Sequence, residues 1–460
     1  MTIAGELAEF LTSTRVDDLP PVTLERAAMS IASTVASAAM GQDIASARII
    51  RDIEKENGGA PQATVWFDGT RLSVAATARV NALASDAAAS DDSDLRSIAH
   101  IGTIISTTAI AMGERLGSSG REVLGAMVLG YEAAGRIDEA LTPGRMQKGF
   151  HGSVSTVFGG TVATGSLLKL TMPQMTQAIA IAATSIGGMA IAANTSCARE
   201  YHAGLSALLG VQAALAAQRG FIAEDTVLEA PRGFFASLGG QAVDDVTRDL
   251  GKSWDIATDM AIKLMPGGHP FHAIAEAAAD AAIAGDVRPA GIRQIMISAI
   301  QMRDWHGPVH PRDLISAAHS VVYFVASAIA DRGFGWEHAT EAKMTDPVIA
   351  ALQDKVVFDP NPAPLPDRFT HRHGGTVTIT MNDGRTFTST CTAPRGSGPR
   401  GVAWADVDAK YRRLVPRSGL SAQRLEASLH AIHHLDEATS VSELTRLLLT
   451  QGRRPMIENR

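Results

Sequence analysis

The chain begins with a long stretch in which apolar residues recur at helical spacing. Residues 3–13 and 22–40 both show this pattern, and Pro20 and Pro21 lie between them. Proline ends one helix and is tolerated in the first turn of the next, so we predict two helices here. Up to about residue 262 the pattern predicts one helical domain. Five further Ala-rich segments of this kind lie at 101–117, 121–141, 156–170, 173–185 and 200–220.

The pattern changes in the segment KLMPGGHPFHA, where two prolines and two glycines interrupt any regular element. Beyond it, residues 291–300 alternate between apolar and polar as a strand does, and residues 311–333 have helical spacing. Residues 376–391 predict a hairpin, because alternating segments flank an Asn-Asp-Gly turn. We therefore predict a mixed α/β unit over 265–398. Helices are then expected at 403–415, 420–435 and 440–450.

Composition excludes several classes of protein. Of the 460 residues, 45% are apolar and 19% are charged, which is too apolar for a disordered chain. The net charge of −7 gives no reason to expect a nucleic-acid partner. Cys197 and Cys391 form neither a disulfide framework nor a thiolate zinc motif. Glu6 and Glu9 stand where a signal peptide would carry cations, and the apolar runs are interrupted, so we predict a cytoplasmic protein without membrane contact.

Common catalytic motifs are missing from the sequence. It contains no nucleotide-binding glycine loop, no H-E-x-x-H and no G-x-S-x-G, which disfavours phosphoryl transfer, nicotinamide chemistry and serine hydrolysis. Among the histidines, His151 directly precedes a predicted helix whose first turn offers Ser153 and free backbone N–H groups. Such a terminus attracts anions. His151 therefore either moves a proton on a bound carboxylate or caps the helix, and the sequence leaves both interpretations open.

An acidic segment, SDDSDLRSIAH, lies between two apolar helices and contains Asp91, Asp92 and His100. Carboxylates and a histidine suit a divalent cation. We favour the alternative, a solvated loop with a helix cap, and expect no metal. The same caution applies to His269 and His272, because such a spacing arises by chance among 14 histidines.

Two cations stand in otherwise apolar or Gly-rich segments, Arg199 in TSCAREYHAG and Lys263 in IKLMPGG. Burying an isolated cation is costly, so each residue either reaches water or binds an anion. In the predicted helix over 311–333, His319 and Tyr323 are four residues apart and share one face. That polar strip serves either a site or hydrogen bonding within the core.

Seven fragments resemble, in their order along the chain, the MmgE/PrpD family, which includes 2-methylcitrate dehydratase, cis-aconitate decarboxylase and iminodisuccinate epimerase. The resemblance covers nearly the whole chain. It implies a mainly α fold, with a large all-helical domain formed by both chain ends (1–264 and 399–460) and a smaller α/β lid domain (265–398). It also implies a homodimer that needs no metal and no organic cofactor. The fragments are LAEFLTSTRVDDLPPVTLERA, GYEAAGRIDEAL, GFHGSVSTVFGGTVATGSLLKL, HAGLSALLGVQAALAAQRGF, LEAPRGFF, KLMPGGHPFHAI and HSVVYFVASAIADRG.

The resemblance also assigns site residues position by position. The active-site histidine of the family falls on His151, and its lid-helix tyrosine falls on Tyr323. The histidine that follows the family's acidic segment falls on His100, after a one-residue insertion. These three residues are the implied catalytic groups. The lysine before the interdomain proline falls on Lys263, which is implied to bind the substrate.

Two departures from the family pattern bear on the substrate. Asp92 and Ser93 match the acidic motif and are implied to bind substrate, but its first aspartate is replaced by Ala89. A second lysine of the family falls on Arg199, which keeps its proton and prefers bidentate contacts with carboxylates. We therefore expect a divergent member that acts on a carboxylate other than methylcitrate or aconitate.

These residues predict a cofactor-independent lyase or isomerase. It would move a proton next to a carboxylate of a small di- or tricarboxylate, in a dehydration, a decarboxylation or an epimerisation. The alternative is a catalytically inactive homologue that serves as a binding or scaffolding protein. For the enzyme we expect Lys263, Arg199 and His151 to converge in one cleft. Because neither cation has an obvious carboxylate partner nearby in the sequence, the two charges would repel each other in such a cleft unless an anionic ligand bound there.

Overall fold

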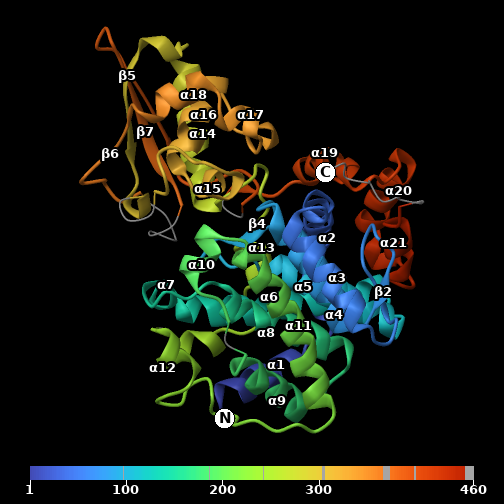
Figure 1. The fold of residues 1–460 in the computed structure, drawn as a ribbon. Coiled ribbons are helices and arrows are strands. Elements are labelled where there is room, and N and C mark those ends of the chain that lie inside the picture. The colour runs from blue at the N-terminus through green and yellow to red at the C-terminus, as the bar shows by residue number, and fades with distance from the viewer. Residues whose placement is uncertain are drawn as a thin grey trace.

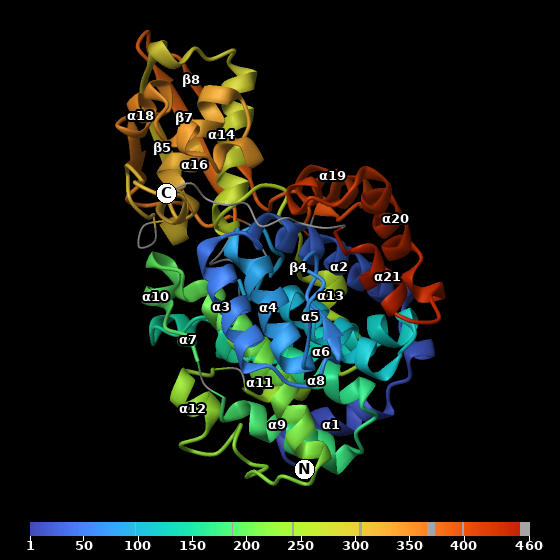
Figure 2. The same ribbon diagram turned by 45° about the vertical axis from the view of Figure 1, so that its right-hand side comes forward.

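The structure is a computed structural model, which describes residues 1–96, 98–185, 187–241, 243–302, 306–365, 373–397 and 400–450. It is mainly helical with small sheets, as the sequence predicts. Two lobes are visible in Figure 1, and the turned view in Figure 2 separates them further. We call the described residues of 1–262 and 400–450 the helical body, those of 271–397 the lid, and 263–270 the joining segment.

The helical body contains both ends of the described chain. The predicted helices of this lobe are confirmed, while α3, the short helices α7, α10, α12 and α13, and the two antiparallel ladders β1–β2 and β3–β4 were not predicted. Its elements are α1 (Ile3–Ser13), α2 (Pro21–Gly41), α3 (Ala45–Asn57), β1 (Ala63–Thr64), β2 (Arg71–Leu72), α4 (Val74–Ala87), β3 (Ser93–Asp94), α5 (Ile101–Leu116), α6 (Gly120–Leu141), α7 (Gly144–Gln147), α8 (Ser153–Leu167), α9 (Met172–Ala183), α10 (Ala190–Thr195), α11 (Ala198–Gln218), α12 (Phe234–Leu238), α13 (Asp255–Thr258), β4 (Met260–Ala261), α19 (Trp404–Leu414), α20 (Ala422–His433) and α21 (Ser442–Leu447).

Helix α2 lies at the centre of this lobe and packs against α4, α5, α6 and α19. Most of its residues are buried, and these are mainly alanines and other apolar residues with small serines and threonines between them. Small residues let such helices approach closely. A Cβ at Gly130 of α6 would lie only 2.6 Å from the carbonyl oxygen of Gly159 in α8, so glycine is required there.

The lid is built on a four-stranded sheet with the order β6-β5-β7-β8. The predicted hairpin is confirmed: β7 and β8 pair antiparallel, and Val377, Ile379 and Met381 point into the lid core. Helix α14 covers this sheet and packs against α16. The elements of the lid are α14 (His272–Ala284), β5 (Ile292–Ser298), α15 (Leu314–Ala318), α16 (Val321–Asp331), α17 (Glu341–Met344), α18 (Pro347–Gln353), β6 (Val356–Phe358), β7 (Gly375–Met381) and β8 (Thr386–Cys391).

The helix predicted over 311–333 is interrupted, and this part of the prediction is wrong. Helix α15 ends at Ala318, and α16 begins at Val321 after Ser320 accepts a hydrogen bond from the backbone N–H of Tyr323. A serine that caps a new helix competes with continuation of the old one. His319 and Tyr323 therefore lie on different elements and do not form a strip on one helix.

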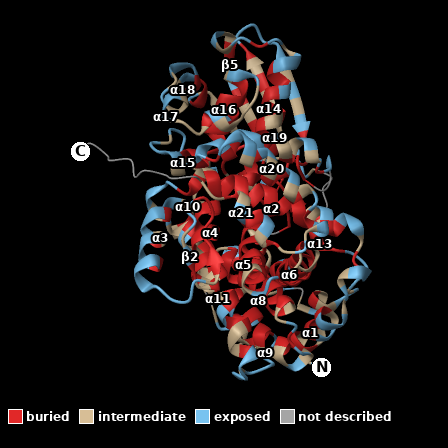
Figure 3. Cartoon of the chain, turned by 90° about the vertical axis from the view of Figure 1, so that its right-hand side faces the viewer, coloured by how far each residue is buried: buried red, intermediate tan, exposed pale blue. Residues whose placement is uncertain are grey.

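Each lobe has its own hydrophobic core. One core draws on residues between Ala4 and Leu448 of the helical body, and the other on residues between Phe271 and Cys391 of the lid. Figure 3 shows the buried interior in both lobes. The predicted boundary between 398 and 399 and residues 451–460 lie outside the described residues. No helix in the described part of the chain is both long enough and apolar enough to cross a membrane.

Candidate active site

A cavity of about 200 Å³ lies where the two lobes and the joining segment meet. The walls of this cavity are formed by loops and helix ends from several parts of the chain. Lys263, Arg199 and His151 line this one cavity together with His100, although they are distant in sequence. The other histidines and the other arginine in its wall are His269, His319 and Arg145.

Short local structures place the side chains around this cavity. His151 lies just before α8, and its backbone N–H donates to the carbonyl of Gly188 at 2.9 Å. His100 lies just before α5. The ladder β3–β4 pairs Ser93 with Ala261, which brings the acidic segment next to the strand that precedes Lys263. Two segments that are far apart in the sequence therefore share one wall.

Two buried carboxylates hold the cations of the site. The Nε–H of Arg199 donates to Asp86 at 2.9 Å. His100 Nδ1 lies 2.5 Å from Asp91 and 2.9 Å from Asp86. Lys263 Nζ lies 3.6 Å from Asp91. Because each cation faces a carboxylate, the network is charged but largely compensated.

Two of the four histidines in the wall of this cavity, His100 and His151, differ in charge at neutral pH. Burial would lower the pKa of His100, but the charges of Asp91 and Asp86 outweigh it and raise the pKa to about 9. His151 faces no such carboxylate, so burial and the nearby charge of His100 hold its pKa well below the ordinary value. The ring centroids are 6.3 Å apart. One cavity thus presents a cationic ring and a neutral ring to the same ligand.

Lys263 and Arg199 face this cavity with hydrogen-bonding capacity to spare. Burial lowers the pKa of Lys263, and nearby Arg199 lowers it further, while Asp91 acts in the opposite direction. The guanidinium of Arg199 donates through Nε and Nη2 to Asp86 and to the carbonyl of Ala87. Within the described residues, no partner is found for its Nη1. Both side chains can therefore bind a carboxylate.

Two expectations from the sequence require correction. The acidic segment is not a solvated loop: Asp91 and Asp92 are fully buried, Asp91 beside the cation of Lys263 and Asp92 beside the hydroxyl of Ser30. Arg199 and Lys263 are also not isolated, since Asp86 and Asp91 pair with them. Ala89 leaves one carboxylate missing from the acidic motif, but Asp86 supplies one from the preceding turn of α4.

Some residues assigned by resemblance do not reach this cavity. The Tyr323 hydroxyl donates to the carbonyl of His338 at 2.7 Å and lines a neighbouring cavity instead. Asp92 accepts a hydrogen bond from Ser30 at 2.8 Å, inside the helical body. Ser93 acts indirectly, because its hydroxyl lies 2.6 Å from Nδ1 of His269, which does line the cavity.

Sequence reasoning missed Asp86, set His269 aside and left the role of His319 open. Asp86 is a single carboxylate at the end of the Ala-rich helix α4, and the argument applied to isolated cations would have marked it. His269 was set aside because its spacing from His272 is common. His319 reaches the cavity only because the helix breaks after Ala318, and no pattern in the sequence announced that break.

The group Asp86, Asp91 and His100 also has the donor atoms of a cation site. One ligand atom from each residue lies within 4.8 Å of the others. In this arrangement, however, the His100 nitrogen carries a proton directed at the carboxylates, and Lys263 and Arg199 add positive charge. The donor set therefore fits an internal ion-pair network better than a divalent ion.

The fold and the site define a class of protein. It is mainly α and has two lobes, and histidines and cations surround one cavity at the joint between the lobes. Residues 5–245 match the MmgE/PrpD N-terminal domain and residues 265–434 match the MmgE/PrpD C-terminal domain. The chain therefore belongs to the MmgE/PrpD family. The C-terminal match continues into the helices that return to the helical body, so it does not coincide with one lobe.

Curated relatives cover nearly the whole chain at low identity. Cis-aconitate decarboxylase of Homo sapiens is 25% identical over 97% of this chain and 94% of its own length. Cis-aconitate decarboxylase of Aspergillus terreus is 24% identical over 99% of this chain and 97% of its own. A cis-aconitate decarboxylase-like protein of Aspergillus oryzae is 23% identical over 97% of both. These relatives are named for carboxy-lyase activity.

Proposed function

We propose that this protein is a cofactor-independent lyase or isomerase that transfers a proton next to a carboxylate of a small di- or tricarboxylate. The observation that carries the proposal is the pair His100 and His151, one charged and one neutral, facing one cavity beside Lys263 and Arg199. The names of the relatives support a carboxy-lyase as the first reaction to test.

Lys263 and Arg199 bind the carboxylates of the substrate in this proposal. Removing a proton from the carbon next to a carboxylate, or adding one there, develops negative charge on that carboxylate in the transition state. Fixed cations in a buried cavity stabilise this charge more strongly than water does. Arg199 adds a planar group suited to a carboxylate, and Asp86 fixes its orientation.

His151 is the base and His100 is the acid. In a dehydration, His151 takes the proton from carbon, the carbon–oxygen bond breaks, and His100 gives its proton to the departing hydroxide. In a decarboxylation, the electron pair released with carbon dioxide forms a new bond to the His100 proton. In an epimerisation, one ring removes the proton and the other returns one to the opposite face. Asp91 and Asp86 keep His100 charged in the resting enzyme.

Two further features belong to the proposal, the oligomeric state and the independence from metals. The homodimer stays a prediction, which light scattering tests by comparing the measured mass with that of one chain. Metal independence is expected because the carboxylates already face cations. Exhaustive chelation should therefore leave turnover unchanged, and activity restored by one added metal would contradict this part.

The experiment that tests the function is an assay of the purified chain in deuterated water. A panel of hydroxy, unsaturated and amino dicarboxylates, with cis-aconitate included, is followed by proton NMR. We expect turnover of at least one compound: a decarboxylation or an epimerisation brings deuterium to the carbon next to a carboxylate, and a dehydration yields the unsaturated acid. Tight binding without turnover or exchange across the panel would instead support the inactive, ligand-binding homologue.

A further inference from the structure

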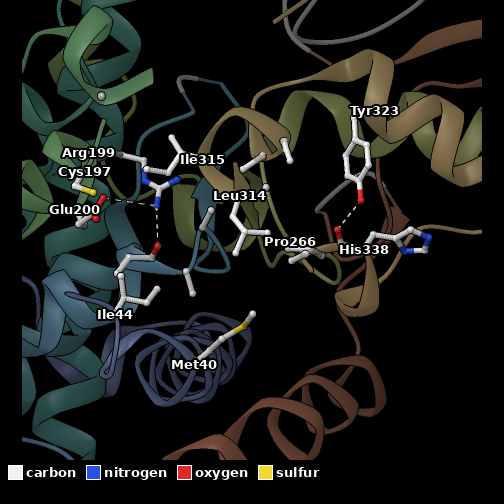
Figure 4. Close-up of a pocket in the computed structure, with 18 of the residues that line it drawn as sticks. Met40, Ile44, Cys197, Arg199, Glu200, Pro266, Leu314, Ile315, Tyr323 and His338 are labelled. Carbon is white, nitrogen blue, oxygen red and sulfur yellow. Dashed lines mark hydrogen bonds and ion pairs between the residues drawn. The ribbon is translucent and has the colours of Figure 1, made fainter. Parts of the chain in front are cut away.

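A second and larger cavity, of about 340 Å³, adjoins the candidate active site. Figure 4 shows its wall, with Leu314 and Ile315 of the lid near Arg199 and with Met40 and Ile44 of the helical body below them. Side chains from both lobes and from the joining segment contribute, and most of them are apolar. They include Ala87, Ala88, Ala89, Pro266, Ala318 and Phe324.

The two cavities meet at shared residues. Arg199 and Gly267 line both of them. A ligand whose carboxylate contacts the Arg199 guanidinium can therefore extend from the charged cavity into the apolar one. Gly267 has a φ of +93°, and a Cβ there would lie 2.5 Å from the Phe324 ring, so glycine keeps the backbone close to this wall.

Apart from Arg417, which is exposed, the charged and hydroxyl groups in the wall of the apolar cavity are engaged within the protein. Glu200 accepts a hydrogen bond from Ser46 at 2.8 Å and lies 3.9 Å from Arg199. The Tyr323 hydroxyl donates to the carbonyl of His338. These contacts leave hydrocarbon as the surface best able to receive a ligand group. An apolar cavity of about 150 Å³ accommodates benzene, so this one has room for an aromatic ring.

The charges of the site favour few carboxylates on the substrate. His100, Lys263 and Arg199 supply three positive charges, while Asp86 and Asp91 supply two negative ones. Arg145 does not change this balance, because Asp138 pairs with it at 2.8 Å. A tricarboxylate would leave more unpaired negative charge in a buried cavity than a dicarboxylate would.

From these observations we propose that the substrate is a dicarboxylate that carries a hydrocarbon substituent about the size of an aromatic ring. Its carboxylates lie beside Lys263 and Arg199, and its substituent occupies the apolar cavity between Ile44 and Phe324. The inference rests on the proposed function for the location of the carboxylates, and it narrows the substrate class of that function.

Calorimetric titration of the full chain with 2-benzylsuccinate and with succinate measures how the substituent alone affects the affinity. Neither compound has a hydroxyl group that could leave. One additional methylene group in a matched apolar pocket changes the affinity about 10- to 200-fold. We therefore expect benzylsuccinate to bind at least about 100-fold more tightly than succinate. Ala318→Phe fills the cavity and should abolish the preference while succinate binding persists. Ala350→Phe in α18, which lines neither cavity, is the matched control and should keep the preference.

Leu314→Gln provides a second variant, because this half-exposed side chain can change without disturbing the core. It should reduce the preference about 10-fold, by making one wall of the cavity polar. Equal affinities for the two compounds, or an undiminished preference in Ala318→Phe and Leu314→Gln, would overturn the inference. Tighter binding of benzylsuccinate without turnover of any dicarboxylate would uphold the inference and refute the proposed function. Turnover of a dicarboxylate without tighter binding of benzylsuccinate would uphold the function and refute the inference.

Discussion

The helical body and the lid contribute different kinds of side chain to the cavities at the joint between them. The charged groups that face the candidate active site, His100, Arg199 and Lys263, come from the helical body and from the start of the joining segment. The lid supplies His319 and the apolar side chains of α15 and α16, such as Ile315. In the proposed function, the helical body and the joining segment therefore supply the charged groups, and the lid completes an apolar cavity whose other walls come from the helical body.

The largest effect should come from the neutral base on the helical body. His151→Gln removes proton transfer, which typically contributes about 10²–10⁴-fold, so kcat should fall by that factor while ligand affinity changes little. Turnover kinetics and calorimetric titration check the two parts. His202→Gln is the matched control, because its ring lies 5.7 Å from His151 without lining the cavity. Normal turnover in His151→Gln would refute the assigned base.

Lys263→Met should act mainly on substrate binding. Hydrogen bonds to charged groups are worth about 1.5–3 kcal/mol, which corresponds to a 10- to 100-fold rise in KM or Kd. The change is measured from initial rates and from titration of a dicarboxylate. Lys148→Met is the control, since this lysine donates to backbone carbonyls outside the cavity. An unchanged Kd would show that the carboxylates bind elsewhere.

Asp86→Asn should alter the pH dependence. The acid His100 has a pKa of about 9, so kcat/KM of the parent enzyme should fall as the pH rises through about 9. Removing one of the two carboxylates that raise this pKa moves the alkaline limb toward lower pH. At pH 9 the variant should be several-fold less active than the parent, after both are normalised at pH 7. Asp245→Asn, on the surface, should leave the profile in place, and an unshifted limb in Asp86→Asn would exclude His100 as the acid.

The smallest effect on turnover is expected from the lid residue Tyr323. Tyr323→Phe loses the hydrogen bond to the His338 carbonyl, which should lower the free energy of unfolding by about 1 kcal/mol. The kcat should fall less than about threefold, because the hydroxyl lies outside the cavity that holds the two histidines. Urea unfolding and initial rates measure these quantities. A loss of kcat as large as that of His151→Gln would restore Tyr323 to the chemistry.

Local patterns in the sequence determined the elements of the fold and the candidates for its chemistry. Spacing of apolar residues and prolines is a property of neighbours in the chain, so α1, α2 and the β7–β8 hairpin were predictable. Isolated cations and a histidine before a helix likewise marked Lys263, Arg199 and His151. Resemblance to a family then indicated how the two ends of the chain form one lobe.

Only the tertiary structure determines which charged side chains of the site pair with one another. Asp86 meets Arg199 and Asp91 meets Lys263 across more than one hundred positions of the chain, because ladder β3–β4 and the packing of α4 against α11 bring them together. The same packing fixes which ring of His100 and His151 carries a proton, since a pKa depends on burial and on charges within a few ångströms. After the break between α15 and α16, His319 lines the candidate active site and Tyr323 lines the apolar cavity, and this placement depends on how the lid packs against the helical body, which no local pattern records.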